Sequence, residues 1–211
     1  MPETDNTEAR ILEAAKQVFY RKGLDGARMQ EIADEAGINK AMLHYYFRTK
    51  EKLFDKIFLE ALGKILPKIA TTLGSDAPLA EKFDVISGYY HDLLLSTPYL
   101  PVFVVQTLQH NPDRLLQFII TQSGINPAET FGKFLMQIQQ EVALGNIRPI
   151  DPRHLVLNLI SMCVFPFMMR PMFIRIIGMK DEAFEAFVNE RRHLVPQLIM
   201  QSIQPDQPPP D

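Results

Sequence analysis

The amino-acid sequence predicts an all-α fold. Apolar residues recur at the i, i+3, i+4, i+7 spacing of amphipathic helices from one end of the 211-residue chain to the other. No segment shows the sustained alternation of apolar and polar residues that predicts a half-buried strand. Glycine and proline residues divide the chain into pieces of helical length. These observations together predict helices joined by short loops.

Three helices are predicted in the first 48 residues. The first begins near Thr7, a suitable N-cap, and ends at Gly23. The second ends at Gly37, and the third begins after Asn39, which can cap it. The apolar residues expected on the inner faces are Ile11, Ala15, Val18, Phe19, Met29, Ile32, Ala33, Ala36, Leu43 and Phe47.

A long fourth helix is predicted after Thr49, and roughly five more helices are predicted after the loop at residues 74–78. The last two strongly amphipathic segments span residues 152–177 and 181–203. The tail at 204–211 is rich in proline and is predicted to be disordered. Breaks between these later helices are expected at residues 97–98, 111–112, 124–127 and 145–152.

The composition is that of an ordinary globular protein, with 46% hydrophobic and 22% charged residues. The N-terminus contains acidic residues and lacks the apolar stretch of a signal peptide. The longest nearly apolar run has 15 residues, between His154 and Arg170, and is too short for a membrane span. We therefore expect a cytoplasmic protein that makes no membrane contact.

No metal, cofactor or catalytic activity is expected. Cys163 is the single cysteine and is interpreted as a small core residue, and no Cys/His cluster has the spacing of a zinc site. The sequence contains no glycine-rich phosphate loop, no Gly-x-Ser-x-Gly and no His-Glu-x-x-His. His91 and Asp92 are the nearest approach to a catalytic pair. Because adjacent residues of a helix point apart, they are interpreted as ordinary surface residues.

The most informative stretch is residues 29–52, MQEIADEAGINKAMLHYYFRTKEK, which predicts two short helices joined by a glycine turn. Ala33 is small enough for two helices to cross closely. Gly37 can adopt the left-handed conformation that ends the first of these helices. Ile38 is apolar and can fill the turn. These features predict a helix-turn-helix.

The helix that follows Asn39 has an outer face suited to the major groove of double-stranded DNA. The whole chain has a net charge of -3, but between Lys40 and Lys52 four basic residues accompany one acidic residue. Lysine can donate to guanine, and alanine or methionine can pack on a thymine methyl. Tyr45 and Lys50 are predicted to contact phosphates. Base contacts are expected from Lys40, Ala41, Met42 and His44, and positions near the DNA backbone from Arg28 and Gln30.

Two other interpretations of this stretch stay open. A helical hairpin with a glycine turn can serve packing alone. The chain can also be a helical module that binds a small molecule or a protein and has lost DNA binding. An acidic or apolar outer face would indicate such a module. The aromatic pair Tyr45 and Tyr46 beside Lys50 favours DNA binding instead.

Residues 7–54 resemble the DNA-binding domain of the TetR family of transcriptional regulators. The family pattern has a first helix with a phenylalanine and a final glycine, then Ile-Ala-x-x-Ala-Gly, Tyr-x-Phe and Lys-x-x-Leu. The corresponding residues here are Phe19 and Gly23, IADEAG at 32–37, YYF at 45–47 and KEKL at 50–53.

The resemblance implies a homodimeric regulator, a repressor that binds a near-palindromic operator through its third helix and is released by a small apolar ligand. The chain departs from the family at Ala27-Arg28, where Thr-Thr is common, and also at residues 39, 41–42 and 44. The operator sequence therefore cannot be inferred by analogy. Carried over by position, DNA contacts are implied for Arg28, Met29, Gln30, Lys40, Ala41, Met42, His44, Tyr45, Tyr46 and Lys50.

The predicted organisation is a helix-turn-helix domain at 1–54, a helical regulatory and dimerisation domain at 55–203, and the tail at 204–211. The resemblance implies that the last two long helices of each subunit form a four-helix bundle across a two-fold axis. The alternative is that their apolar stripes face only their own subunit. The stripes consist of Leu155, Leu159, Met162, Phe184, Phe187, Leu194 and Leu198.

A small-molecule effector would need a cavity with a few polar anchors between the middle helices. The ten methionines and fourteen phenylalanines can line such a cavity, although residues of this kind more often form the core. His110 precedes Asn-Pro, where a histidine is more often on the surface. The candidate ligand-binding residues are Tyr90, Gln106, His110, Phe131, Phe134 and Phe165.

Overall fold

The structure is a computed structural model that describes residues 3–110, 113, 117 and 126–205. Every regular element in these ranges is a helix, which confirms the all-α prediction. The first four helices are α1 (Glu3–Gly26), α2 (Met29–Glu35), α3 (Lys40–Tyr46) and α4 (Lys50–Gly74). The others are α5 (Leu79–Ser96), α6 (Leu100–His110), α8 (Pro127–Ala143), α9 (Pro152–Met168), α10 (Arg170–Arg175) and α11 (Asp181–Ser202).

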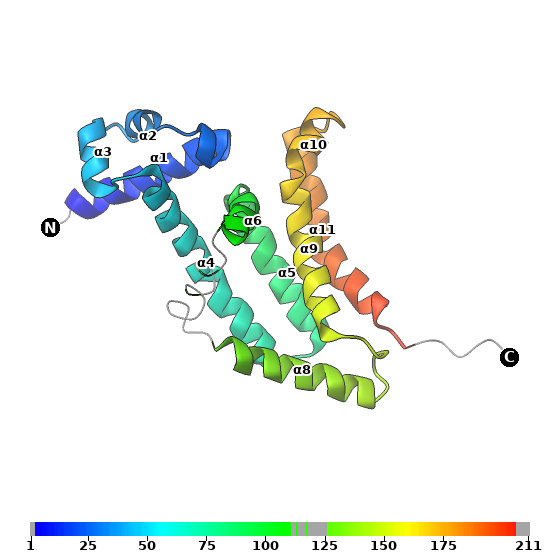
Figure 1. Cartoon of the computed structure of the whole chain (residues 1–211). Coiled ribbons are helices and arrows are strands. Elements are labelled where there is room, and N and C mark those ends of the chain that lie inside the picture. The colour runs from blue at the N-terminus through cyan, green and yellow to red at the C-terminus, as the bar shows by residue number, and fades with distance from the viewer. Residues whose placement is uncertain (1–2, 111–112, 114–116, 118–125, 206–211) are drawn as a thin grey trace.

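Two regions are connected by the long helix α4 (Figure 1). The head consists of α1, α2, α3 and the first turn of α4, and the body consists of α5 to α11. At the end of α4 far from the head, α8 packs across it. Inside the body, α5 packs against α4, α9 and α11. The short helix α10 lies at the same end of the body as the head (Figure 1).

The apolar core has two parts. One part begins in the head and continues into the body, where Leu100, Phe167 and Phe184 belong to the same cluster as Phe19 and Phe54. The rings of Phe19 and Phe54 meet edge to face with their centroids 4.7 Å apart. The second part lies wholly in the body and in the end of α4. The head therefore packs on the body through a shared core.

Several helix ends differ from the predicted ones. Helix α1 begins at Glu3 instead of Thr7, and its last turn passes Gly23, whose φ is 68°. The segment predicted at 152–177 is divided into α9 and α10 at Met169. The break occurs because Pro171 has no amide hydrogen and its ring clashes with a preceding carbonyl.

Two predicted breaks, at residues 111–112 and 124–125, and most of the tail lie outside the described residues. Among the helices that the structure describes, none is both long and apolar enough to cross a membrane.

Candidate nucleic-acid interface

The turn between α2 and α3 is held by the conformations that the sequence predicts. Gly37 has a φ of 64°, in the left-handed region that favours glycine. Its amide donates to the Asp34 carbonyl at 3.1 Å, which closes the end of α2. Asn39 caps α3, because its side-chain oxygen accepts the amide of Met42 at 2.7 Å. These contacts fix the direction in which α3 leaves the turn.

Arg10 of α1 is a positioning residue that sequence reasoning missed. Its Nη2 donates to the Ala36 carbonyl at 2.6 Å and lies 3.4 Å from the Gly37 carbonyl. A Cβ atom at Gly37 would lie only 3.2 Å from the same nitrogen. Arg10 therefore ties the turn to α1. No sequence motif signals this contact, because both acceptors are main-chain oxygens 26 or more residues away.

Ion pairs join α1 to α2 on another side of the head. Lys22 pairs with Glu31 and Arg21 pairs with Glu35, each at 2.5 Å. The hydrogen bond from Lys22 lowers the pKa of the Glu31 carboxyl below its ordinary value. Arg21 and Lys22 are therefore paired with carboxylates of the head itself.

The outer face of α3 is exposed as predicted. Leu43 is fully buried against the head, whereas Lys40, Ala41 and His44 are exposed. Met42 is 43% exposed and Tyr45 is 84% exposed, a large value for an aromatic side chain. Helix α3 therefore presents a mixed cationic, aromatic and apolar surface to solvent.

The remaining predicted DNA-contacting residues lie around this face in different surroundings. Tyr46 is half-buried and meets the Tyr45 ring edge to face, with centroids 5.6 Å apart. Met29 is also half-buried and packs against the core of the head. Arg28 is exposed immediately before α2, and Gln30 is exposed with its amide donating to Asp34 at 2.8 Å.

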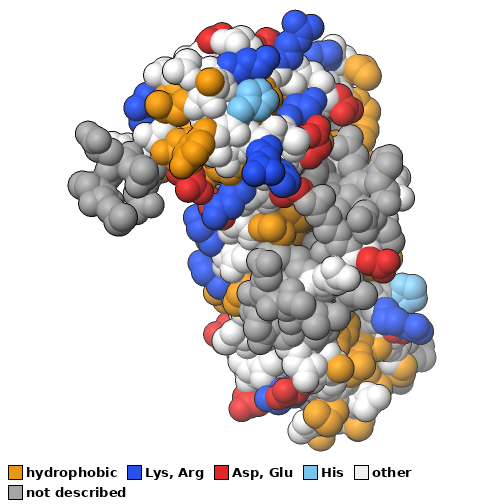
Figure 2. Space-filling view, turned by 60° about the vertical axis from the view of Figure 1, so that its left-hand side comes forward, with side chains coloured by type: hydrophobic (Ala, Val, Ile, Leu, Met, Phe, Trp, Pro, Cys, Tyr) orange, Lys and Arg blue, Asp and Glu red, His pale blue; other side chains and the backbone are white. Residues whose placement is uncertain are grey.

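The connection from α3 to α4 adds positive charge to the same surface. Lys50 Nζ donates to the Asp25 carbonyl at 3.4 Å, and the His44 ring lies 3.2 Å from the Arg48 carbonyl. Within the part of the chain that the structure describes, Lys40, Arg48, Lys50 and Lys52 form no ion pair with a carboxylate. Figure 2 shows Lys and Arg side chains beside a histidine and apolar side chains at the upper end of the molecule.

The residues predicted to bind a ligand do not gather around one cavity. Phe134 is fully buried in the core of the body, whereas Phe131 and Phe165 are 37% and 58% exposed. Tyr90 is half-buried where the two core clusters meet, and burial raises its pKa to about 12. The main cavities among the described residues are lined by other side chains. The side chains of Gln106 and His110 lie outside the described residues.

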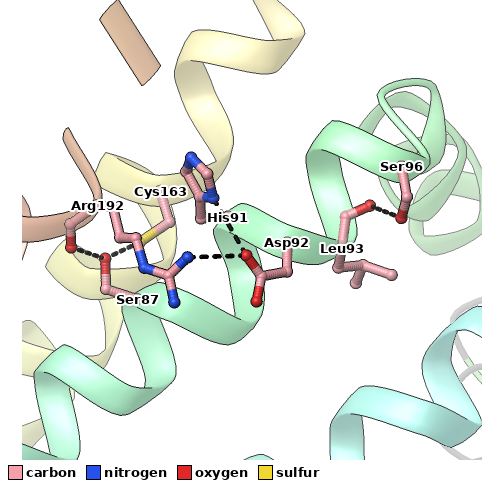
Figure 3. Close-up of polar contacts among 7 residues, drawn as sticks. All are labelled: Ser87, His91, Asp92, Leu93, Ser96, Cys163 and Arg192. Carbon is pink, nitrogen blue, oxygen red and sulfur yellow. Dashed lines mark hydrogen bonds and ion pairs between the residues drawn. The ribbon is translucent and has the colours of Figure 1, made fainter. Parts of the chain in front are cut away.

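A polar cluster that sequence reasoning missed lies between α5, α9 and α11 (Figure 3). Ser87 donates to the Arg192 carbonyl at 2.9 Å and accepts from the Cys163 thiol at 3.7 Å. Arg192 in turn donates to Asp92 at 3.0 Å. The interpretation of His91 as a surface residue is wrong, because His91 is only 7% exposed and its Nε2 is buried without a partner among the described residues.

The cavity beside this cluster has a volume of about 20 Å³, which is room for roughly one water molecule. Burial raises the pKa of the half-buried Cys163 thiol to about 11, so the sulfur stays protonated and unreactive at neutral pH. The cluster therefore joins the three helices and is too small to hold an effector.

The residues predicted to form a dimer interface divide into two groups. Leu155, Leu159 and Phe184 are at most 4% exposed and pack inside their own chain, because they face the body. Leu198 is 38% exposed and is free to face a partner. Met162, Phe187 and Leu194 are half-buried. The exposed apolar side chains of α9 are instead Leu157, Ile160 and Phe165.

The comparisons with known proteins agree with this geometry. Residues 11–57 match the family model described as bacterial regulatory proteins, tetR family. The uncharacterized HTH-type transcriptional regulator YfiR of Bacillus subtilis is 37% identical over 151 residues, which cover 70% of this chain and 71% of YfiR. The HTH-type transcriptional regulator RutR of Escherichia coli K12 is 28% identical over 208 residues, covering 92% of this chain and 89% of RutR.

The fold is also found in solved structures. The crystal structure of HlyIIR, a hemolysin II transcriptional regulator, superposes with a TM-score of 0.61. The two chains are 21% identical, and the match covers 96% of this chain and 99% of HlyIIR. The relatives are regulators of transcription and not enzymes. The exposed helix-turn-helix, the family model and the relatives together show that this chain belongs to the TetR family of DNA-binding transcriptional regulators.

Proposed function

We propose that this protein is a homodimeric repressor that binds a near-palindromic operator through α3 and is released from it by a small, largely apolar ligand. One observation carries the proposal: α3 and the residues after it present cations without carboxylate partners in the described chain beside the exposed Tyr45 and Met42. Free cations are available to phosphates and guanine, and the apolar atoms suit a thymine methyl. A module that had lost DNA binding would not need this surface.

Dimerisation is supported by the exposed faces of α9 and α11. Leu157, Ile160 and Phe165 follow the i, i+3, i+8 spacing of one helical face of α9, and Leu198 is exposed on α11. Apolar side chains in such a row are the kind that a two-fold related helix buries. A dimer of this kind presents two α3 helices to major grooves about 34 to 36 Å apart on one side of DNA. A protein bound over two successive grooves blocks access to that DNA, which is why we propose repression.

The first experiment is selection of bound fragments from random duplex DNA, followed by fluorescence anisotropy on the enriched site across a salt series. We expect a two-fold symmetric site and an affinity that falls steeply as salt rises. Lys50→Ala should weaken binding and reduce the slope of log affinity against log salt by about 1. Tyr45→Ala should weaken binding across all sites, since its phosphate contact carries no sequence information.

Lys133→Ala is the matched control, because Lys133 lies on α8 at the far end of the body and forms only a surface ion pair with Glu129. If Tyr45→Ala and Lys50→Ala bind the enriched site as well as the control does, the assignment of the DNA-binding face fails. No enrichment from a folded dimer would favour a module that has lost DNA binding.

The dimer is tested by light scattering of the purified protein at micromolar concentration. Phe165→Glu should produce monomers, because it places a charge within the proposed interface. Phe131→Glu is the control, since Phe131 is an exposed phenylalanine on α8. A dimer that persists in Phe165→Glu would place the interface elsewhere.

A further inference from the structure

A large cleft separates the head from the body. It has a volume of about 640 Å³ and lies between the end of α1 and the start of α4 on one side, and α6, α9 and α10 on the other. In Figure 1 the C-terminal end of α1 faces the body at the level of α10. The volume of the cleft is in the range of small-molecule sites, about 300 to 1,000 Å³. A molecule bound here would touch the head and the body at the same time.

Part of the cleft is lined by apolar side chains. Phe54 of the head and Phe167 of the body are among them, and both belong to the core cluster that joins the two regions. Val102, which is 43% exposed, and Ile174 extend the apolar surface toward solvent. Phe54 and Phe167 are at most 6% exposed, so Val102 and Ile174 supply the apolar surface that a ligand would gain free energy by covering.

The rim of the cleft carries charges of both signs. It has Arg21, Lys22, Arg170 and Arg175 together with Asp25 and Asp181. Arg170 pairs with Asp181, and the two α1 cations pair with carboxylates of α2. Arg175 is exposed and has no ion pair among the described residues. It is thus the guanidinium on this rim that is available to an anion.

Tyr99 lies beside the cleft with its hydroxyl enclosed by the protein. Its hydroxyl is buried and has no hydrogen-bond partner among the described residues. Tyr99 forms part of the wall between the cleft and a neighbouring groove of about 490 Å³. Burial raises the pKa of Tyr99 well above its ordinary value, so its hydroxyl remains a neutral donor. A buried polar group without a partner is costly and rare.

We propose that this cleft binds a small amphipathic monocarboxylate, with its apolar chain on Val102 and Ile174 and its carboxylate on Arg175. The Arg175 guanidinium selects the charge, since a guanidinium binds a carboxylate through two parallel hydrogen bonds. The apolar side chains select a hydrocarbon chain. The regulatory consequence rests on the proposed function: because the ligand contacts head and body together, it favours one orientation of α3 and changes operator affinity.

Binding is tested by isothermal titration calorimetry of the full chain with sodium octanoate, without DNA. We expect saturable binding that Arg175→Glu and Val102→Asp each weaken at least about tenfold, because the first removes a charge-assisted contact and the second places a carboxylate against the hydrocarbon chain. Decanoate should bind more tightly, by about three- to fourfold for each added methylene. Lys133→Glu is the control, because it makes the same charge change on α8 far from the cleft.

Three results would overturn the site. The first is that neither octanoate nor decanoate binds. The second is that both cleft variants leave the octanoate affinity unchanged, and the third is that octyltrimethylammonium, which carries the opposite charge, binds equally well.

The regulatory step is tested by adding octanoate to the complex of the protein with the selected DNA. A change in operator affinity of about fivefold or more, absent in Arg175→Glu, supports it, and an unchanged affinity overturns it. If no DNA is selected but octanoate binds and Arg175→Glu abolishes that binding, the site stands and the proposed operator function fails.

Discussion

Lys40 in the head and Lys82 in the body have the same side chain in opposite surroundings. Lys40 is exposed on α3 and has no ion pair among the described residues. Lys82 is 1% exposed, and its Nζ donates to the Leu73 carbonyl at 2.8 Å and to Gln137 at 2.6 Å. The outer face of α3 leaves its cations open to a partner, whereas the buried Lys82 joins α5 to α4 and α8. A lysine therefore indicates binding at one of these positions and structure at the other.

The strongest test of this comparison makes the same substitution in both regions. Lys82→Met should lower the free energy of unfolding by about 3 kcal/mol, because it leaves a buried carbonyl and a buried amide oxygen without a donor. Lys40→Met should change it by less than about 0.5 kcal/mol, as exposed substitutions usually do. Urea unfolding followed by circular dichroism measures both. Equal losses of unfolding free energy in Lys82→Met and Lys40→Met would remove the distinction between the buried lysine of the body and the exposed lysine of the head.

The buried cluster of the body also predicts a dependence of stability on pH. Burial raises the pKa of Cys163 from its ordinary value of 9 to about 11. Between these values the folded state holds more protons than the unfolded state, so the free energy of unfolding falls as pH rises. Tyr90, raised to about 12, acts in the same direction at higher pH, whereas the lowered pKa of Lys82 acts in the opposite one.

Cys163→Ala isolates one part of this dependence. The unmodified chain should lose about 2 kcal/mol more than the variant between pH 8 and pH 10.5, since one pKa unit corresponds to about 1.4 kcal/mol. The measurement is urea unfolding at both pH values, so that any cavity cost of the alanine cancels in the difference. Parallel losses in both proteins would show that the thiol titrates normally in the folded state.

A smaller loss of stability is expected when the contact between Arg10 and the Ala36 carbonyl is removed. Arg10→Ala should lower the free energy of unfolding by about 1 to 2 kcal/mol, because it removes a charged donor from the Ala36 carbonyl. It should also weaken operator binding, since the turn that aims α3 loses its tie to α1. Arg148→Ala is the matched control in the body: Arg148 donates to the Ser202 carbonyl, and the loop between α8 and α9 that carries it lies away from α3 (Figure 1). If both variants bind DNA equally, Arg10 does not position α3.

The head was predictable because its determinants are local. The Asn39 cap and the left-handed Gly37 lie within a few residues of their hydrogen-bond partners, so the spacing of these residues indicated the turn, and the resemblance to the TetR family identified it as a helix-turn-helix. Arg10 was missed because its acceptors are main-chain atoms of a distant segment. The same reason explains why the Ser87 and Cys163 contact could not be predicted.

The inward face of α9 could not be read from the sequence for a different reason. This helix has apolar residues on two sides, with Leu155 and Leu159 buried and Leu157 and Ile160 exposed. Periodicity assigns an inner face only when the opposite face is polar. The start of the helix at Pro152 was therefore predicted, whereas its end and the side that meets the body were not, and that side was decided by packing against α5 and α11.

The continuous core between head and body has an evolutionary consequence. Phe19 and Phe54 are packed in one cluster with Leu100, Phe167 and Phe184, so the head is not an interchangeable module. A head transplanted from a relative would have to match the ring positions of this body as well as recognise a new operator. We expect DNA specificity to diverge through exposed residues such as Met42 and His44, whose replacement leaves this core untouched.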